Sequence, residues 1–225
     1  INIKDILSSD IQTNFTIIGG LNEIGKNRLN QFLKSGKLIF TNDFLVLSQI
    51  DAIDVIVDAT GYPKLGAEIA LNAILAGKDV VTLNVETDVT VGPVLKKLAK
   101  KKDAVYTLSA GDEPAALKEL YDFVDGLGFK VICAGKGKNN PLDIEANPSS
   151  LADYAAKKGS SARMMTSFVD GTKSMIEMAC LSNATGLIPD CRGMHGPKVD
   201  IKQIISKFCL KNEGGILKKE GVVDF

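Results

Sequence analysis

The first half of the sequence alternates short apolar runs with amphipathic segments, and this alternation restricts the fold more than any other feature. The apolar runs lie at 14–20, 37–43, 55–61, 79–84, 104–111 and 130–135. The segments between them, such as LGAEIALNAILAG at 65–77, carry apolar residues at helical spacing, and several close on glycine. Strands separated by helices in this way predict βαβ units and a mostly parallel sheet.

The pattern changes after about residue 134, where the polar loop GKGKNNPLDIEANPSS follows the last of these runs. We therefore expect a partial dinucleotide-binding domain at 1–133 and an α+β substrate or catalytic domain at 134–225. The predicted fold class is α/β, with a Rossmann-like, doubly wound parallel sheet. Ligands of such sheets bind at the carboxyl ends of the strands. The loops DATGYP, NVETD, SAGDEP and AGKGKNNP, which follow predicted strands, are therefore the expected place of the chemistry.

The glycine fingerprint that normally opens a dinucleotide-binding fold, GxGxxG between a strand and a helix, does not occur near the start of this sequence. The nearest cluster, GGLNEIG at 19–25, has a different spacing. Either it is a degenerate phosphate loop, or the first βα unit is missing and FTIIGGLNE holds the second strand, which we favour. Asn22, Glu23, Lys26 and Arg28 would then lie near the adenosine ribose. Acidic residues there favour NAD and basic ones NADP, so both cofactors stay open.

Composition excludes several classes of partner. Lysine plus arginine and aspartate plus glutamate balance at 27 each, so we expect neither nucleic acid nor a membrane surface as a partner. KKLAKKKD is therefore interpreted as the exposed face of a helix, and no apolar run is long enough to cross a bilayer. The four cysteines are widely spaced and form no CxxC pair, which favours structural thiols and a cytoplasmic location.

The segment SFVDGTKSMIEMACLSNATG, residues 167–186, predicts a helix with three charged residues on one face. Asp170, Lys173 and Glu177 are spaced i, i+3 and i+7, which brings them to the same side of a helix. The pattern alone leaves two interpretations open. Either Asp170 caps the helix and the other two residues form a solvated ion-pair stripe, or the three side chains point into a site.

Five blocks of the sequence resemble one family, in the same order. They are DVIVDATGYPKLGAEIALNAILAGKDVVTLNVETDVTVGPVLKKLA, YTLSAGDEPAAL, AGKGKNNP, SFVDGTKSMIEMACLSNATGL and RGMHGP. The family is the homoserine-dehydrogenase-like NAD(P)-dependent oxidoreductases with a C-terminal SAF-type domain, which includes enzymes called deoxyxylulose-phosphate-reductoisomerase-like. The resemblance runs from about residue 40 to the end. It implies a homo-oligomer, and a chain truncated at both ends.

The resemblance also implies catalytic roles. Homoserine dehydrogenases place an aspartate and a lysine one helical turn apart, and Asp170 and Lys173 resemble that pair at a spacing of i+3. Hydride transfer to a carbonyl leaves an alkoxide, which a lysine ammonium can stabilise and protonate. We therefore expect Lys173 to be the general acid/base, Asp170 its partner, and Glu177 a substrate-binding or supporting group.

Further site residues follow from the loops after the predicted strands. The expected cofactor-binding residues are Thr60, Gly61, Asn84, Glu86 and Gly111. Glu86 has capping of the following helix as its alternative role. Homoserine dehydrogenases carry a lysine after the asparagine that matches Asn84, but Val85 stands there in this sequence. This departure weakens a simple homoserine mechanism.

The expected substrate-binding residues are Lys136, Lys138, Asn139, Glu177, Arg192, His195, Asp112 and Glu113. The two lysines of this set offer cationic donors for a carboxylate, a phosphate or an alkoxide. Asp112 and Glu113 either cap a helix or, as adjacent carboxylates, hold Mg²⁺ or Mn²⁺, so a divalent metal stays possible although no ligand set is assigned. His195, the only histidine, either binds an anionic group together with Arg192 or is a plain loop residue.

The expected function is hydride transfer between NADP or NAD and a carbonyl or alcohol of a small polar substrate, of the homoserine-dehydrogenase type. One alternative is a metal-dependent sugar-phosphate reductoisomerase, which the acidic GDE and the missing lysine after Asn84 favour. Another is a non-catalytic nucleotide-sensing or scaffold module, which the missing glycine fingerprint favours.

Overall fold

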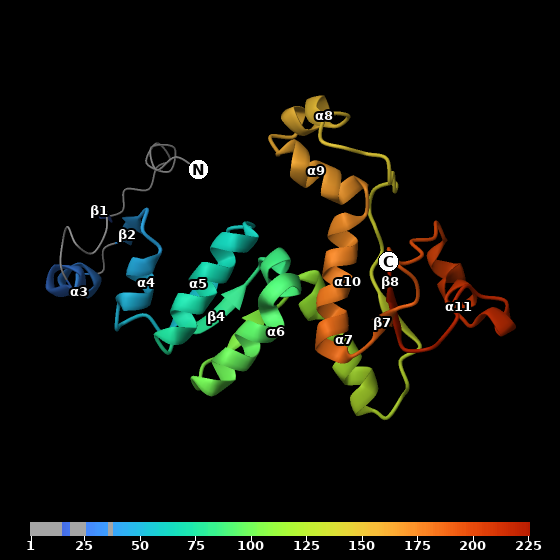
Figure 1. Cartoon of the computed structure of the whole chain (residues 1–225), viewed down its shortest axis with the longest axis horizontal. Helices are drawn as coiled ribbons and strands as arrows, with labels where there is room; N and C mark the ends of the chain where they lie inside the picture. The colour runs from blue at the N-terminus through green and yellow to red at the C-terminus, as the bar shows by residue number, and fades with distance from the viewer. Residues whose placement is uncertain (1–14, 19–25, 36–37) are drawn as a thin grey trace.

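The computed structural model describes residues 15–18, 26–35 and 38–225 (Figure 1). The glycine cluster at 19–25, with Asn22 and Glu23, lies outside these ranges. The N-terminal and central elements are β1 (Phe15–Ile18), α3 (Lys26–Lys34), β2 (Leu38–Thr41), α4 (Leu45–Gln49), β3 (Val55–Asp58), α5 (Pro63–Leu75), β4 (Asp79–Thr82), α6 (Val85–Lys101), β5 (Tyr106–Leu108) and α7 (Glu113–Gly126). The remaining elements are β6 (Cys133–Gly135), α8 (Ala152–Lys157), α9 (Ala162–Val169), α10 (Thr172–Thr185), β7 (Ile188–Pro189), η1 (Ile201–Gln203), α11 (Ile204–Lys207), η2 (Lys211–Glu213) and β8 (Val222–Asp224).

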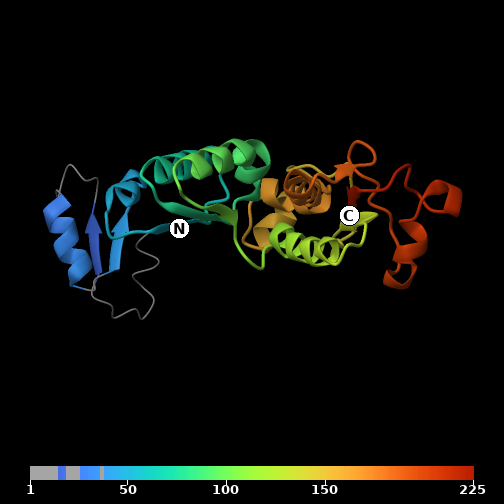
Figure 2. The ribbon, with the colours of Figure 1, turned by 90° about the horizontal axis from the view of Figure 1, so that it is seen from below.

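The predicted α/β class is confirmed, because every strand pairing among the named strands is parallel and helices connect the strands. The described strands form three sheets, β1–β2, β3–β4–β5 and β6–β8–β7. These sheets follow one another along an elongated molecule (Figures 1 and 2). The last strand, β8, lies between β6 and β7, so the end of the sequence completes the third sheet. The domain boundary at 133/134 stays a prediction.

The central sheet has its core on one face. The side chains of β3 alternate, so that Ile56 faces the core while Val55 and Val57 are exposed. α5 and α6 pack together on the covered face, where Ile74, Val80 and Leu95 belong to one apolar cluster (Figure 2). The carboxyl ends of β3, β4 and β5 are thereby held at a common edge, next to the start of α6.

The α4–β3 loop is fastened to this core by a buried lysine. Lys78, just before β4, donates from Nζ to the backbone carbonyls of Ile50 and Ile53, at 2.6 Å each. The Ile53 carbonyl gains a partner from Lys78, and the Ile50 carbonyl, which also accepts from the Ile53 backbone at 3.2 Å, gains a second one.

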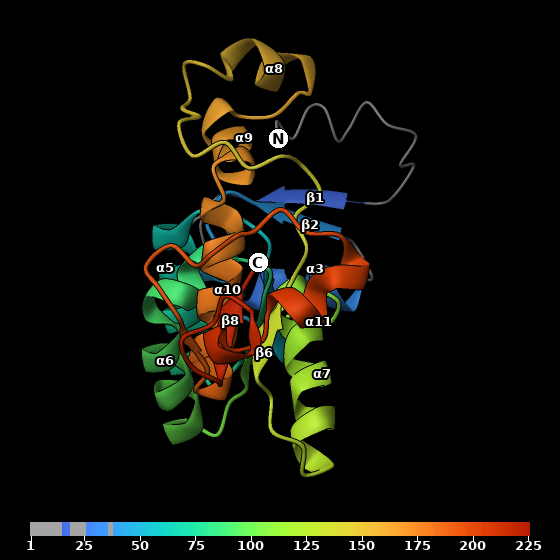
Figure 3. The same cartoon turned by 90° about the vertical axis from the view of Figure 1, so that its right-hand side faces the viewer.

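α10 is the central helix of the C-terminal half. It packs against α6 on one side, α7 on another and β8 on a third (Figure 3). Met178 and Leu181 of this helix join Leu187 and Val223 in an apolar cluster. Because α10 is enclosed by several elements, two of its polar residues, Ser174 and Glu177, are buried as well.

The prediction that Asp170, Lys173 and Glu177 share a face of one helix is wrong. α9 ends one residue before Asp170, and Gly171 adopts a left-handed conformation with φ of +86°, which breaks the helix. Lys173 and Glu177 lie one turn apart on α10, whereas Asp170 stands before the break. Glu177 is buried, so the alternative of a solvated stripe does not describe it either.

Candidate active site

Six charged side chains from four parts of the chain gather beside the first half of α10. We call them the charged cluster: Glu86 on α6, Asp112 and Glu113 at the start of α7, Lys136 after β6, and Lys173 and Glu177 on α10. The sequence predicted all six as site residues. Glu86 and the acidic pair follow β4 and β5 of the central sheet, whereas Lys136 follows β6 of the third sheet. α10 brings them together, because it packs against α6, α7 and β8.

The two lysines of the charged cluster have different surroundings. Lys136 Nζ contacts Glu177 Oε2 and lies 3.0 Å from Glu113 Oε1. The side chain of Lys136 is 17% exposed and that of Glu177 only 3%. Lys173 Nζ lies 2.9 Å from Glu86 Oε1, in a pair whose side chains are 24% and 29% exposed. Lys136 therefore lies inside the cluster, and Lys173 lies at its more accessible edge.

Burial and neighbouring charges shift the pKa values of Glu177, Asp112, Glu113 and Lys136. Burial raises the pKa of Glu177, although the Lys136 ammonium opposes the shift. Burial, followed by the neighbouring Glu113, also raises the pKa of Asp112, whereas the hydrogen bond from Lys136 lowers the pKa of Glu113. Burial alone would lower the pKa of Lys136, but its bonds to Glu177 and Glu113 outweigh burial and raise it. Lys136 is consequently held as an ammonium ion.

One carboxylate oxygen of the cluster has no partner. Asp112 Oδ2 is buried and makes no hydrogen bond to any described residue. A buried polar atom without a partner costs free energy unless something satisfies it. This oxygen is therefore available to a group that enters the cluster from outside.

A buried polar network fixes the loop after β3 against the start of α6. Asn84 Oδ1 caps α6 by accepting from the Thr87 backbone at 3.1 Å. Asn84 Nδ2 donates to Tyr62 O at 3.1 Å and to Thr60 Oγ1 at 3.3 Å. Asp58 Oδ1 accepts from the Thr60 backbone and hydroxyl at 2.9 and 2.7 Å. Asn84 therefore positions the turn that contains Thr60 and the helix that begins before Glu86.

Two of the predicted cofactor-binding residues border open space. Gly61 and Gly111 have φ of +66° and +86°, and a side chain added at either position would meet no atom within 4 Å. They lie in the loops after β3 and β5, on the two sides of Asn84 in the sheet order. A flat ring could approach the backbone at these positions.

Three other predicted site residues, Lys138, Asn139 and Asp170, are not part of the charged cluster. Lys138 Nζ donates to Asn140 Oδ1 at 2.7 Å and to the Phe168 carbonyl, so it fastens its loop to α9. Burial lowers the pKa of Lys138, and the Asp170 charge opposes this shift. Asp170 Oδ1 accepts from the first residue of α10 at 2.8 Å, and within the described ranges no ion pair joins Asp170 to Lys173. Asn139 is exposed.

His195 lies between two carboxylates, Asp190 and Asp224, which are not close to it in a recognisable sequence motif. His195 Nδ1 is 2.7 Å from Asp224 Oδ2, and Nε2 is 3.3 Å from Asp190 Oδ2. Asp224 also accepts from the backbones of His195, Gly196 and Phe225. Asp190 directly follows the short strand β7 and Asp224 is the last residue of β8, and this position was the signal that the sequence offered. Arg192 is exposed.

This histidine cluster borders the charged cluster. Gly135 pairs with Asp224 in the sheet, so Lys136 follows directly after the strand neighbour of Asp224. The ring of Phe225 lies close to both Gly171, at the start of α10, and Gly196. At the carboxyl edge of the third sheet, Asp224 therefore holds His195, and the neighbouring strand leads into Lys136.

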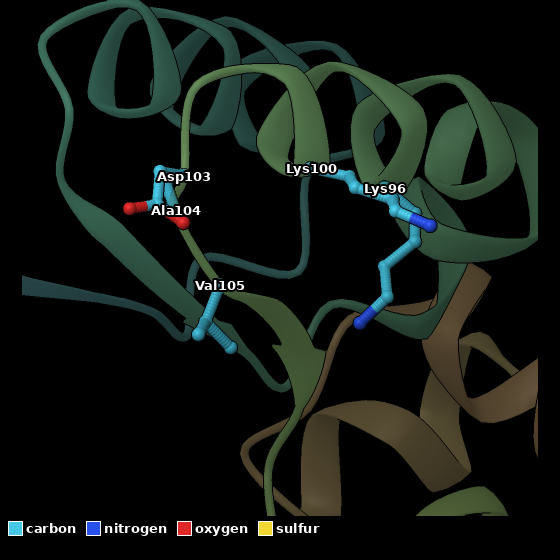
Figure 4. A pocket seen from close by; sticks show the side chains of 5 residues that line it. All are labelled: Lys96, Lys100, Asp103, Ala104 and Val105. Atoms are coloured by element: carbon cyan, nitrogen blue, oxygen red, sulfur yellow. The ribbon is translucent and has the colours of Figure 1, made fainter.

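Two shallow hollows lie at the opposite edge of the central sheet, away from both clusters. One is lined by Lys96, Lys100, Asp103, Ala104 and Val105, before β5 (Figure 4). The other is lined by residues around the starts of β3 and β4: Asp51, Ile53, Asp54, Ala76, Gly77, Lys78 and Asp79. In the part of the chain that the structure describes, no three His, Cys, Asp or Glu residues are placed to hold a metal ion. That same part contains no helix of the length and apolarity needed to cross a membrane.

Comparison with known families defines the class of protein, which is an oxidoreductase. The family that matches is "Oxidoreductase DRL, catalytic domain", over residues 111–225, more than half of the chain. The chain belongs to this family. The matched span contains Asp112, Glu113, Lys136, Lys173 and Glu177, that is, the charged cluster except Glu86.

Eleven chains of solved structures match as well. A putative homoserine dehydrogenase from Archaeoglobus fulgidus is 18% identical with a TM-score of 0.43, over 69% of this chain and 51% of the other. DOX-P reductoisomerase, in complex with NADPH, fosmidomycin and magnesium, is 15% identical with a TM-score of 0.43, over 83% and 56%. Levoglucosan dehydrogenase, in complex with NADH and levoglucosan, is 19% identical with a TM-score of 0.37, over 67% and 40%.

The chain spans about half the length of the first two of these structures. Because their TM-scores are below 0.5 and their identities below 25%, these likenesses carry no information about substrate or mechanism. No curated protein matches the sequence.

Proposed function

We propose that this oxidoreductase transfers a hydride between NAD(P) and a carbonyl or alcohol carbon of a small polar substrate. The observation that carries the proposal is Lys173, an accessible ammonium paired with Glu86 at 2.9 Å where the loops after β4, β5 and β6 meet α10. A lysine at such a place can give a proton to an oxygen on which negative charge develops.

The residues after β3, β4 and β5 fit a nicotinamide cofactor. Open space over Gly61 and Gly111 accommodates a flat ring, and Thr60 and Asn84 hold the turn between them. When bound, the cofactor supplies or accepts the hydride. Asn84 supports this site as a positioning residue, since both hydrogens of its amide already have partners.

The proton moves through this chain's own residues. In reduction, the hydride forms a C–H bond at the carbonyl carbon, the C=O π electrons move to oxygen, and that oxygen takes a proton from Lys173 Nζ. In oxidation, Lys173 takes the hydroxyl proton as the hydride leaves. Glu86 orients the ammonium. Asp170, which caps the first turn of α10, positions Lys173 through the backbone.

The finer assignment is part of the proposal. The homoserine-dehydrogenase type, the SAF-type domain and a homo-oligomer rest on the sequence blocks that resemble that family. A reductoisomerase is the second candidate, and the observation that favours it is the carboxylate-rich start of α7 with the unpartnered Asp112 Oδ2. A cytoplasmic location is retained as a proposal.

The test combines binding and turnover. The chain contains no tryptophan, so NADPH and NADH fluorescence can be followed with low background during titration. Turnover is then measured with small polar aldehydes, ketones and alcohols. We expect Lys173→Met to retain cofactor binding but to lower kcat by about 100-fold or more. Lys157→Met, at an exposed lysine of α8, should change neither quantity.

Two results would contradict the proposal in different ways. Full turnover by Lys173→Met would remove Lys173 from the chemistry and leave the oxidoreductase assignment in place. Failure of the wild-type chain to bind either nicotinamide would refute the cofactor and would favour the sensor or scaffold alternative.

A further inference from the structure

Lys136 stands where carboxylates from two different elements converge. Glu113 reaches it from the start of α7 at 3.0 Å, and Glu177 reaches it from the second turn of α10. The nearly complete burial of the Glu177 side chain makes this contact costly to break, because an isolated charge would remain inside the protein. The ammonium is therefore a fixed part of the site.

A divalent metal does not fit this arrangement. Mg²⁺ or Mn²⁺ would need the oxygens of Glu113 and Glu177, which are hard ligands of the kind these ions prefer. Those oxygens already surround Lys136 Nζ. An ion bound to them would lie within roughly 4 Å of a positive charge, a distance at which like charges repel strongly. Lysine and metal therefore exclude each other in the conformation observed.

The ammonium still has capacity for a ligand. A lysine ammonium carries three N–H donors, and the hydrogen bonds of Lys136 use two of them, for Glu113 and Glu177. The third has no partner among the described residues. Lys173 of the same cluster is more exposed, and in the described part of the chain its ion pair is with Glu86 alone. Lys136 can thus act as a constant positive charge, while Lys173 acts as the proton donor.

We propose that Lys136 is a built-in cation of the active site, which binds the reacting oxygen of the substrate in the place of a divalent metal. This inference rests on the proposed function. Its third N–H donates to the substrate oxygen, and Lys136 keeps its proton throughout the reaction. During reduction the developing alkoxide is stabilised by Lys136 and protonated by Lys173. The raised pKa of Lys136 supports this division, because an ammonium held by two carboxylates is a poor proton donor.

The proposal predicts that removing the lysine creates a metal site. Lys136→Ala leaves Glu113 and Glu177 facing an empty position beside Asp112. We expect this variant to bind Mn²⁺, measured by electron paramagnetic resonance, whereas the wild-type chain and the Lys136→Ala/Glu177→Gln double variant do not. We further expect Lys136→Ala to lose about 100-fold in kcat, and millimolar Mn²⁺ to restore part of it. Wild-type turnover should be the same with and without EDTA, and Lys157→Ala should behave as wild type.

Several outcomes would overturn the proposal. The first is that the wild-type chain binds Mn²⁺ and that Glu177→Gln abolishes this binding. The second is that EDTA removes wild-type turnover. The third is that Lys136→Ala folds but binds no Mn²⁺. Circular dichroism checks that the variants fold. If Lys136→Ala does not fold, Mn²⁺ binding and EDTA sensitivity of the wild-type chain still test the proposal. Mn²⁺ binding requires no substrate, so its result is independent of the proposed hydride transfer.

Discussion

Gly66, in the first turns of α5, offers a sharp test of how the site is supported. A Cβ atom placed there would lie 2.4 Å from Thr87 Oγ1, 2.5 Å from Asn84 Nδ2 and 2.5 Å from Asp58 Oδ2. All three contacts fall well inside van der Waals distance, and all three partners are buried. Gly66→Ala must therefore displace the polar network that connects the loop after β3 to α6.

The loss of stability in Gly66→Ala can be estimated from the hydrogen bonds that the added methyl group would break. Asn84 Nδ2 donates two hydrogen bonds, and Thr87 Oγ1 donates one to Pro63 O. Losing two or three bonds at about 1 kcal/mol each, with overpacking of about 1–3 kcal/mol, gives about 4 kcal/mol of lost stability. For a chain of this size that corresponds to a decrease in Tm of roughly 8–16 °C. Nicotinamide binding should weaken together with stability, because Thr60 and Asn84 move.

Gly126→Ala is the matched control, because Gly126 ends α7 and an added Cβ would meet nothing within 4 Å. We expect this change to be neutral or to stabilise the protein by up to about 1 kcal/mol. Calorimetric or urea unfolding of both variants measures the difference. If Gly66→Ala unfolds at the same temperature as Gly126→Ala, the close packing around Gly66 does not support the loop and the reasoning is refuted.

Two further predictions concern buried charged groups. Lys78→Met should lower the free energy of unfolding by about 2–4 kcal/mol, because it removes both hydrogen bonds to carbonyls of the α4–β3 loop. Urea unfolding measures this, with Lys64→Met at an exposed position of α5 as control, and equal midpoints for the two variants would contradict it. Glu177 has a pKa raised above its ordinary value of 4.5, so the folded state holds its proton more tightly than the unfolded state does. The stability of wild type relative to Glu177→Gln should therefore be greatest below pH 4.5 and fall as the pH rises through the raised pKa. Parallel stability curves for the two proteins would disprove this.

The fold class could be predicted from the sequence because it is encoded locally. The apolar runs at 55–61, 79–84 and 104–111 contain β3, β4 and β5, and the periodic segments between them form α5 and α6. The division into three sheets could not be predicted in the same way. The insertion of β8 between β6 and β7 joins segments about 90 residues apart, and no local pattern specifies that pairing.

The candidate site, too, could be predicted from the sequence only in part. The resemblance to homoserine dehydrogenases implied Asp170 as the partner of Lys173, but the left-handed Gly171 between them ends one helix and starts another. The ion-pair partner of Lys173 is Glu86, 87 residues away in the sequence. Residue type therefore identified the lysines and carboxylates as candidates, whereas their pairing depended on how the helices pack.

The sequence by itself determined the α/β class and the set of charged residues in the loops after the strands. The tertiary structure decided which of these charges are buried and which face each other. Lys136 and Glu177 are 41 positions apart, and they meet only because α10 packs between α6, α7 and β8. Burial and ion pairing are properties of that packing, since each depends on atoms that the neighbouring residues in sequence do not supply.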